Sequence, residues 1–330
     1  MLNAPLPMQR AMPNPHLAEY TRRMNRVLDH IDRHLDAPLD LATLASVANF
    51  SPFHFHRVFQ AWLGETLGDY LRRRRLEIAA STLSTHPDEP VLNVALAVGF
   101  GSGEAFARAF KTRFGITPSD WRKQTPARWQ AQLDAVRARQ RDNRNPDQSD
   151  RNFDQAGTGT QEQDRASYTE MENAMNVTIQ TLPPTRVAYL RHIGPYGPAI
   201  GQFWRGKFSP WVASHGLGAN TTYGIGHDDP SVTSPEKCRY DAAVEVAADF
   251  VATGEVGIAE LPGGRYAIAA FRGDVHTIGD AWMTLTRDWL PSSGYQFDNR
   301  PCFERYSGAP GDDRRREDFE CDICIPVRPL

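Results

Sequence analysis

Two arginines occupy the same place in a pattern that the chain carries twice. The stretch SPFHFHRVFQAWLGETLGDY, residues 51–70, is repeated as SGEAFARAFKTRFGITPSDW, residues 102–121. At an offset of 51 residues, Arg57 matches Arg108, and each lies between two phenylalanines that are four residues apart. A guanidinium group can donate two parallel hydrogen bonds to O6 and N7 of guanine, or it can contact a phosphate. Either contact requires an arginine that projects outward from a firmly held helix.

The aromatic spacing predicts which way the arginines point. Phe55 and Phe59 are four residues apart and share one helix face, as do Phe106 and Phe110. Arg57 comes two residues after Phe55, which turns it about 200° around the helix. We therefore expect buried aromatic faces and outward arginines. One copy could equally be part of an ordinary helical bundle, but two copies favour a reader of two successive major-groove faces.

Glu304 is the second candidate for chemistry, because it lies in CFERY, an otherwise apolar strand pattern. Strand alternation puts Glu304, Tyr306 and Cys302 on one face. A carboxylate on an inward face is costly unless a cation pairs with it. We expect Glu304 to meet a cationic, hydrophobic ligand; a structural bond to a neighbouring arginine or tyrosine hydroxyl is the alternative. The other residues expected to bind this ligand are Tyr196, Trp204, Tyr223, Trp282 and Tyr306.

Other residues with chemical potential are interpreted as structural. Cys321 and Cys324 form a CxxC motif, but a spacing of three in a strand points the thiols to opposite faces. His227 lies in GIGHDDP, which predicts a turn. The sequence has no nucleophile elbow, Walker loop or HExxH motif. We therefore predict no catalytic residue, no metal site and no cofactor.

Composition and charge indicate a soluble protein of two domains. The 330 residues are 40% hydrophobic and 23% charged, and no apolar run approaches the roughly 20 residues that cross a bilayer. The N-terminus lacks the apolar core of a signal peptide, so we expect a cytoplasmic protein without membrane contact. Residues 1–125 carry 15 Lys and Arg against 12 Asp and Glu, whereas residues 176–330 carry 15 against 19. This asymmetry is compatible with a nucleic-acid-binding module joined to another domain.

The elements that must position the arginines are helices. Residues 17–125 read as two copies of a helix, a tight turn and a second helix, with a long helix at about 68–83. Ser51 before Pro52 is a strong helix start, because serine caps and proline fits the first turn. Residues 1–16 are expected to be a disordered tail.

The elements that must position Glu304 are mainly strands. Residues 126–174 are polar with almost no aliphatic side chains, which predicts a flexible linker. Residues 175–330 contain β-branched and aromatic runs interrupted by helical stretches at about 198–214 and 275–290. The order of strands, helix and strands occurs twice, which predicts a duplicated α+β module.

The pattern from SPFHFHRVF through VGFGSGEAF to GITPSDWR closely resembles the DNA-binding domain of AraC/XylS-type bacterial transcription regulators, over about residues 20–125. The resemblance implies an all-α domain of two helix-turn-helix units joined by the helix of residues 69–83. The implied base-reading residues are Phe53, His56 and Arg57 in the first reading helix, and Glu104, Ala105 and Arg108 in the second. Contacts to the DNA backbone are assigned to Arg72, Arg73 and Lys111, whereas Arg75 is expected to be partly buried.

The segments PPTRVAYLRHIGPYG, LPGGRYAIAAFRG and RPCFERYSG resemble the GyrI-like small-molecule-binding domain, over about residues 174–330. This domain is also fused to AraC-type readers in the Rob branch of regulators. The resemblance implies two strand–helix–strand–strand modules, built from antiparallel sheet, that face each other across a ligand cleft. It also implies a central glutamate in that cleft, at Glu304.

Together these features predict a one-component transcription regulator and not an enzyme. Its expected partners are double-stranded promoter DNA, RNA polymerase and a small-molecule effector that biases activation. The polar linker argues against rigid coupling between the halves. Two alternatives remain open, because some relatives of the GyrI-like fold hydrolyse reactive natural products and others could sequester a toxic compound. The sequence names neither the promoter nor the effector.

Overall fold

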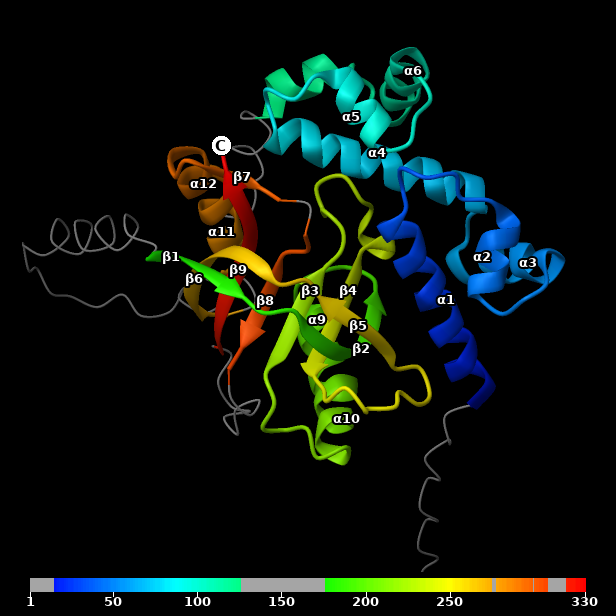
Figure 1. Ribbon diagram of the computed structural model, residues 1–330, viewed down its shortest axis with the longest axis vertical. Coiled ribbons are helices and arrows are strands. Elements are labelled where there is room, and N and C mark those ends of the chain that lie inside the picture. The colour runs from blue at the N-terminus through cyan, green and yellow to red at the C-terminus, as the bar shows by residue number, and fades with distance from the viewer. Residues whose placement is uncertain (1–14, 126–175, 275–276, 299, 308–318) are drawn as a thin grey trace, which may run out of the picture.

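The computed structural model describes residues 15–125, 176–274, 277–298, 300–307 and 319–330, which form a helical half and a sheet-containing half (Figure 1). The predicted linker lies outside the described residues. So does the predicted N-terminal tail up to residue 14, whereas residues 15 and 16 begin the first helix. Among the described residues, no helix is both long and apolar enough to cross a membrane.

The first half is helical, as predicted. Its helices are α1 (Pro15–Arg33), α2 (Leu41–Val47), α3 (Pro52–Leu63), α4 (Leu67–Thr85), α5 (Val91–Ala97) and α6 (Gly103–Phe114), followed by a helical run over 118–125. The Ser51 hydroxyl caps α3 by accepting from the His54 amide, and Ser102 caps α6 by accepting from the Ala105 amide. The two halves of the repeat therefore begin their second helices in the same way.

The repeated aromatic residues form the two cores of this half. Phe59 packs edge-on against Tyr70, with ring centroids 5.5 Å apart, and Phe110 packs edge-on against Trp121 at 5.6 Å. Phe55 is fully buried in the first core. The helices α3 and α6 are therefore each held by an aromatic face, and α4 contributes to both cores.

The two tight turns bring α2 to α3 and α5 to α6 by the same route. Asn49 and Gly99 each adopt a positive φ, of 55° and 83°. A side chain at Gly99 would also meet the Leu35 carbonyl oxygen at 2.6 Å, so this turn requires glycine. The close approach at Gly99 seats the second unit against the C-terminal end of α1.

The second half is an antiparallel sheet of two equivalent modules. Its strands are β1 (Val177–Leu182), β2 (Thr185–Ile193), β3 (Thr222–Gly226), β4 (Arg239–Glu245), β5 (Gly257–Leu261), β6 (Gly264–Gly273), β7 (Tyr295–Phe297), β8 (Phe303–Tyr306) and β9 (Phe319–Pro329). The strand order is β1-β6-β9-β8-β3-β4-β2-β5, with β7 paired to β9. The first module contributes β3, β4, β2 and β5, and the second contributes β8, β9, β6 and β1 in the equivalent order. The two modules therefore meet at the β3–β8 pair, which we call the seam.

Helices cover one face of each module. The first module carries α9 (Pro198–Phe203), the π-helical turn η1 (Trp204–Phe208) and α10 (Ser209–Ser214); the second carries α11 (Ile278–Met283), the π-helical turn η3 (Thr284–Trp289) and α12 (Leu290–Ser292). Pro210 lies within the first of these helical stretches, but the helix continues through a π-helical turn. Pro291 follows η3 in the same way. Such turns accommodate a residue that has no N–H to donate.

Candidate functional site

The predicted base-reading residues are exposed on the second helix of each helix-turn-helix unit. Phe53 is 70% exposed, and the Arg57 guanidinium lies over its ring at 5.9 Å from the centroid. The other five are exposed as well: His56, Arg57, Glu104, Ala105 and Arg108. Because the buried faces of α3 and α6 hold the phenylalanines, these helices present two polar surfaces that could enter DNA grooves.

The residues assigned to the DNA backbone divide into two groups. Arg72 and Lys111 are exposed, as such contacts require. Arg73 lies elsewhere: its guanidinium is 2.7 Å from Glu65 and 3.0 Å from Glu77, in a largely buried cluster. These ion pairs occupy the Arg73 guanidinium, so we withdraw the expectation that Arg73 contacts the DNA backbone. Arg75 is partly buried, as expected, and donates to backbone carbonyl oxygens at the end of α1.

Glu304 is surrounded by three aromatic hydrogen-bond donors. Trp282 Nε1 donates to Oε1 over 3.1 Å, and the hydroxyls of Tyr306 and Tyr240 donate to Oε2 over 2.9 Å and 3.2 Å. Trp204 Nε1 in turn donates to the Tyr240 hydroxyl over 3.2 Å. These donors come from both modules, since α11 and β8 belong to the second and β4 and η1 to the first. We call these five residues the effector cleft, after the ligand cleft that the sequence predicts around Glu304.

The seam between the modules makes room for this arrangement. Gly224 on β3 is paired with Glu304 on β8, and it lies beneath Tyr240. A side chain at Gly224 would overlap the Tyr240 hydroxyl and come within 2.6 Å of Glu304 Oε2. The glycine therefore leaves the space through which a tyrosine of one module reaches the carboxylate of the other.

The carboxylate of Glu304 has no basic partner among the described residues. Only burial and the three aromatic hydrogen bonds shift its pKa. Burial raises the pKa of Glu304 above its ordinary value, although the three aromatic hydrogen bonds act in the opposite direction. An anion that is largely shielded from water and has no cation beside it is in a costly state. A ligand that brought a positive charge to this carboxylate would relieve the cost.

The structure brings together most, but not all, of the aromatic residues predicted for the cleft. Trp204, Trp282 and Tyr306 all lie in it, with Trp204 and Tyr306 at 5.2 Å between ring centroids. Tyr196 stands at its edge, 6.2 Å from Tyr240. Tyr223 does not join them, because it packs on the opposite face of the sheet against Phe303. Its neighbour Gly224 is the β3 residue that faces the cleft.

Sequence reasoning missed Tyr240, which lies within RYDAAVEV of β4. The alternation of that strand could have indicated it, since Tyr240 falls between two charged residues that must face the other way. The CxxC motif follows the predicted geometry: Cys321 packs with the cleft-side cluster and Cys324 with the cluster on the opposite face. No group of three potential metal ligands is found among the described residues.

Sequence reasoning also missed a set of buried and partly buried charges that joins the two halves, which we call the charged interface. Its members come from α1, α4, β2, the β3–β4 loop and β4: Asp29, Asp32, Arg74, Arg191, Asp228, Arg239 and Asp241. Figure 1 shows α4 passing over the end of the sheet-containing half, where the β3–β4 loop reaches it.

Asp228 and Asp32 hold the centre of the charged interface. Asp228 accepts from the Arg239 amide over 2.7 Å, from its Nε over 2.9 Å, and from Arg74. Asp32 on α1 accepts from Arg239 Nη1 over 2.7 Å and from Arg74 Nη2 over 3.2 Å. Burial alone would raise the pKa of Asp228, but the guanidiniums of Arg239 and Arg74 lower it to about 2.

Arg191 makes a second contact to α1. Its Nη2 donates to Asp29 over 2.8 Å and to Asp241 over 2.7 Å, and the Tyr189 hydroxyl donates to the other oxygen of Asp29 over 2.5 Å. Burial would raise the pKa of Asp241, yet the Arg191 guanidinium holds it well below its usual range. Each acid of the interface thus pairs with at least one arginine.

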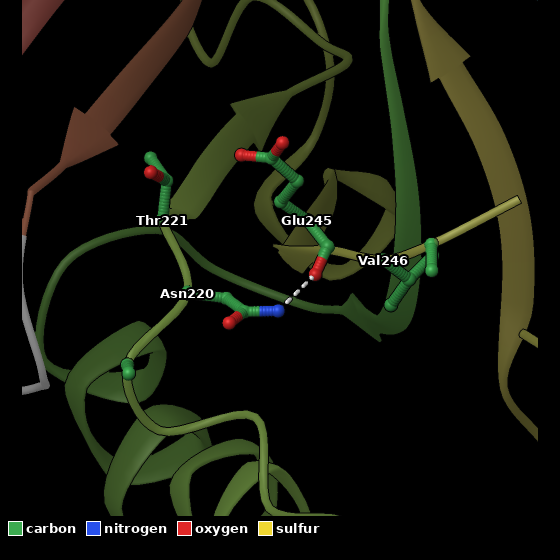
Figure 2. Close-up of a pocket in the computed structure, with 6 residues that line it drawn as sticks. Asn220, Thr221, Glu245 and Val246 are labelled. Atoms are coloured by element: carbon green, nitrogen blue, oxygen red, sulfur yellow. Dashed lines mark hydrogen bonds between the residues drawn. The ribbon is translucent and has the colours of Figure 1, made fainter.

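A surface depression lies apart from both candidate sites. It is formed where the loop before β3 meets the end of β4, and Figure 2 shows Asn220 Nδ2 donating to the Glu245 carbonyl oxygen, over 2.9 Å. The residues that line it include a single carboxylate and no aromatic side chain. This depression therefore offers neither the charge nor the ring surfaces found at Glu304.

Comparisons with known proteins agree with the two-part division. Residues 175–328 match the family described as GyrI-like small molecule binding domain, and residues 44–124 match a helix-turn-helix domain family. The DNA gyrase inhibitor of Cronobacter turicensis is 32% identical over 157 residues, which are 47% of this chain and 98% of that protein. The regulatory protein SoxS of Escherichia coli K12 is 39% identical over 92 residues, which are 28% of this chain and 85% of SoxS.

One solved structure is of a protein bound to DNA. The DNA-binding domain of the transcriptional factor AdpA, in complex with a target DNA, is 30% identical. The match covers 32% of this chain and 95% of that one, with a TM-score of 0.31.

Proposed function

Because this chain belongs to the AraC-type helix-turn-helix regulators and carries a GyrI-like small-molecule-binding domain, we propose that it is a one-component regulator controlled by a hydrophobic cation. In this proposal, α3 and α6 read promoter DNA, and the effector binds at Glu304. The bound effector biases activation through RNA polymerase.

Base reading is assigned to the exposed residues of α3 and α6. Arg57 and Arg108 each stand on the side of a helix opposite its buried phenylalanines, where a guanidinium can reach guanine O6 and N7. Phe53 and Ala105 offer apolar contact to a thymine methyl group, and Glu104 can accept a hydrogen bond from cytosine N4. Arg72 and Lys111 supply charge toward the phosphates.

The single observation that carries the effector assignment is the environment of Glu304. The Glu304 carboxylate lies at the seam of two modules. It accepts from three aromatic donors and has no basic partner among the described residues. An ammonium or phosphonium group with aromatic substituents would neutralise the carboxylate and stack against Trp204 and Trp282. Cation–π contacts of this kind contribute about 0.5–2 kcal/mol each.

The proposal is tested by titrating the full chain with benzyltrimethylammonium and following tryptophan fluorescence, because two tryptophans lie in the effector cleft. The recovered compound is then analysed by mass spectrometry. Saturable binding of an unchanged cation supports a sensor. A chemically altered compound would instead indicate a hydrolase, and a chain that enriches no sequence from a random duplex library would be a sequestering binder.

A further inference from the structure

The two halves of this chain meet through the charged interface as well as through the polypeptide between them. The β3–β4 loop packs Val232 against the apolar core of the second helix-turn-helix unit. Nearby, Lys237 Nζ lies 3.0 Å from Glu65 Oε2. Together with the buried pairs of Asp228 and Asp32, these contacts fix the sheet against both α1 and α4.

The charged interface is also one residue away from the effector cleft. On β4, the Tyr240 hydroxyl donates to Glu304, while Arg239 and Asp241 on either side face the interface. The two sites therefore share one strand and are separated only by its thickness.

Tyr196 makes a second link. Its hydroxyl donates to the Arg239 carbonyl oxygen over 2.6 Å and accepts from the Asp228 amide over 3.2 Å. Its ring stands against Tyr240 at the edge of the cleft. A displacement of either tyrosine would thus move the backbone that carries Arg239 and Asp228.

We propose that the charged interface communicates occupancy of the effector cleft to the DNA-reading helices, through Tyr240 and Tyr196. This inference rests on the function proposed above. A cation at Glu304 competes with the Tyr240 hydroxyl for the carboxylate and releases that side chain. Arg239 and Asp228 then shift against Asp32 and Arg74. Buried ion pairs respond in discrete steps, because a displaced partner leaves an uncompensated charge.

When the cation binds, the orientation of α4 relative to α1 changes. Arg74 is on α4 between the two units, and Asp32 is on α1 of the first unit. Loss of their shared contact with the sheet alters how α3 and α6 are presented to one DNA duplex. By linkage, DNA must then alter cation affinity by the same factor that the cation alters DNA affinity.

The test measures that factor in the full chain. The dissociation constant of benzyltrimethylammonium is determined with and without a saturating duplex, selected by the chain from a random library. The wild type is expected to show a shift of about fivefold or more. Asp32→Asn is expected to retain binding of each ligand alone but to lose most of the shift. Lys207→Gln, which removes an ion pair within the second half only, should keep it.

The outcomes separate the two claims. If the wild type binds both ligands without any shift, the coupling is overturned while the proposed function stands. If the cation does not bind at all, the proposed function fails and the coupling falls with it. Because Asp32→Asn could unfold the chain, hydrogen exchange of the wild type provides an independent readout. The cation should alter exchange in α1 and α4, and changes confined to residues 185–307 would contradict the proposal.

Discussion

Tyr240 and Glu304 are joined by a hydrogen bond of 3.2 Å between strands of the two different modules. Tyr240 is also the residue between Arg239 and Asp241, both of which face the helical half. One short strand thus has an anion-bound tyrosine on one side and, on the other, an arginine that pairs with Asp32 of α1 and donates to the Tyr70 hydroxyl of α4. The effector cleft and the DNA-reading half are separated by a single β-strand.

Replacing the arginines of the reading helices should weaken specific DNA binding. Arg57→Ala and Arg108→Ala should each reduce the affinity for the selected duplex by about 1–3 kcal/mol and relax the base preference at one position. Both side chains are exposed, so the melting temperature should not change. Arg26→Ala, an exposed arginine on α1, is the matched control. An unchanged base preference in both variants would refute the assignment of α3 and α6.

Glu304→Gln should stabilise the second half at neutral pH. Since the pKa of Glu304 is raised on folding, the protonated form favours the folded state. Its contribution is fully present below the unfolded pKa and is lost as pH rises through the folded pKa. The wild type should therefore gain melting temperature relative to Glu304→Gln as pH falls from neutral toward 4.5, the ordinary pKa of a glutamate. Parallel pH profiles for the two proteins would show that the carboxyl carries no such cost.

Gly224→Ala should close the effector cleft. The added methyl group would overlap the Tyr240 hydroxyl and crowd Glu304, so cation affinity should fall by at least about tenfold, or 1.4 kcal/mol. Gly218→Ala is the matched control, because nothing lies within 4 Å of a side chain there. Full cation binding by Gly224→Ala would place the ligand away from the β3–β8 seam.

Asp228→Asn should destabilise the contact between the halves and remove part of its acid sensitivity. The pKa of Asp228 is lowered to about 2, so the carboxylate contributes stability above about pH 4 and loses it as pH falls toward 2. Breaking a buried pair costs about 3–5 kcal/mol. Thermal unfolding at pH 7 and between pH 4 and 2 measures both effects. A variant as stable as the wild type at pH 7 would contradict the role of Asp228 in the interface.

The spacing of apolar residues was sufficient to predict the helices and the place of Glu304 in the cleft. Phe55 and Phe59 share a helix face whatever packs on them, so the aromatic cores followed from spacing alone. Glu304 was found because a carboxylate interrupts an apolar strand. The two-module sheet was predicted in outline, because each run of strands could be identified locally.

Contacts between distant segments could not be predicted in the same way. The run Arg72–Arg75 points all around a helix, and only the docked sheet decides that Arg74 is buried while Arg72 is exposed. Tyr223 was expected in the cleft, but the register of β3 against β8 turns Gly224 toward Glu304 instead. Asp32 and Arg239 are each unremarkable in sequence, and their pairing depends on how the two halves meet.

The most direct test of the proposed function compares a cation with its neutral isostere. Benzyltrimethylammonium and neopentylbenzene have the same shape and differ in charge, and both are titrated into wild type and Glu304→Gln. The glutamine variant should lose about tenfold or more in affinity for the cation while binding the neutral compound as the wild type does. Equal losses for both compounds would show that Glu304 has a structural role and that the cleft does not recognise positive charge.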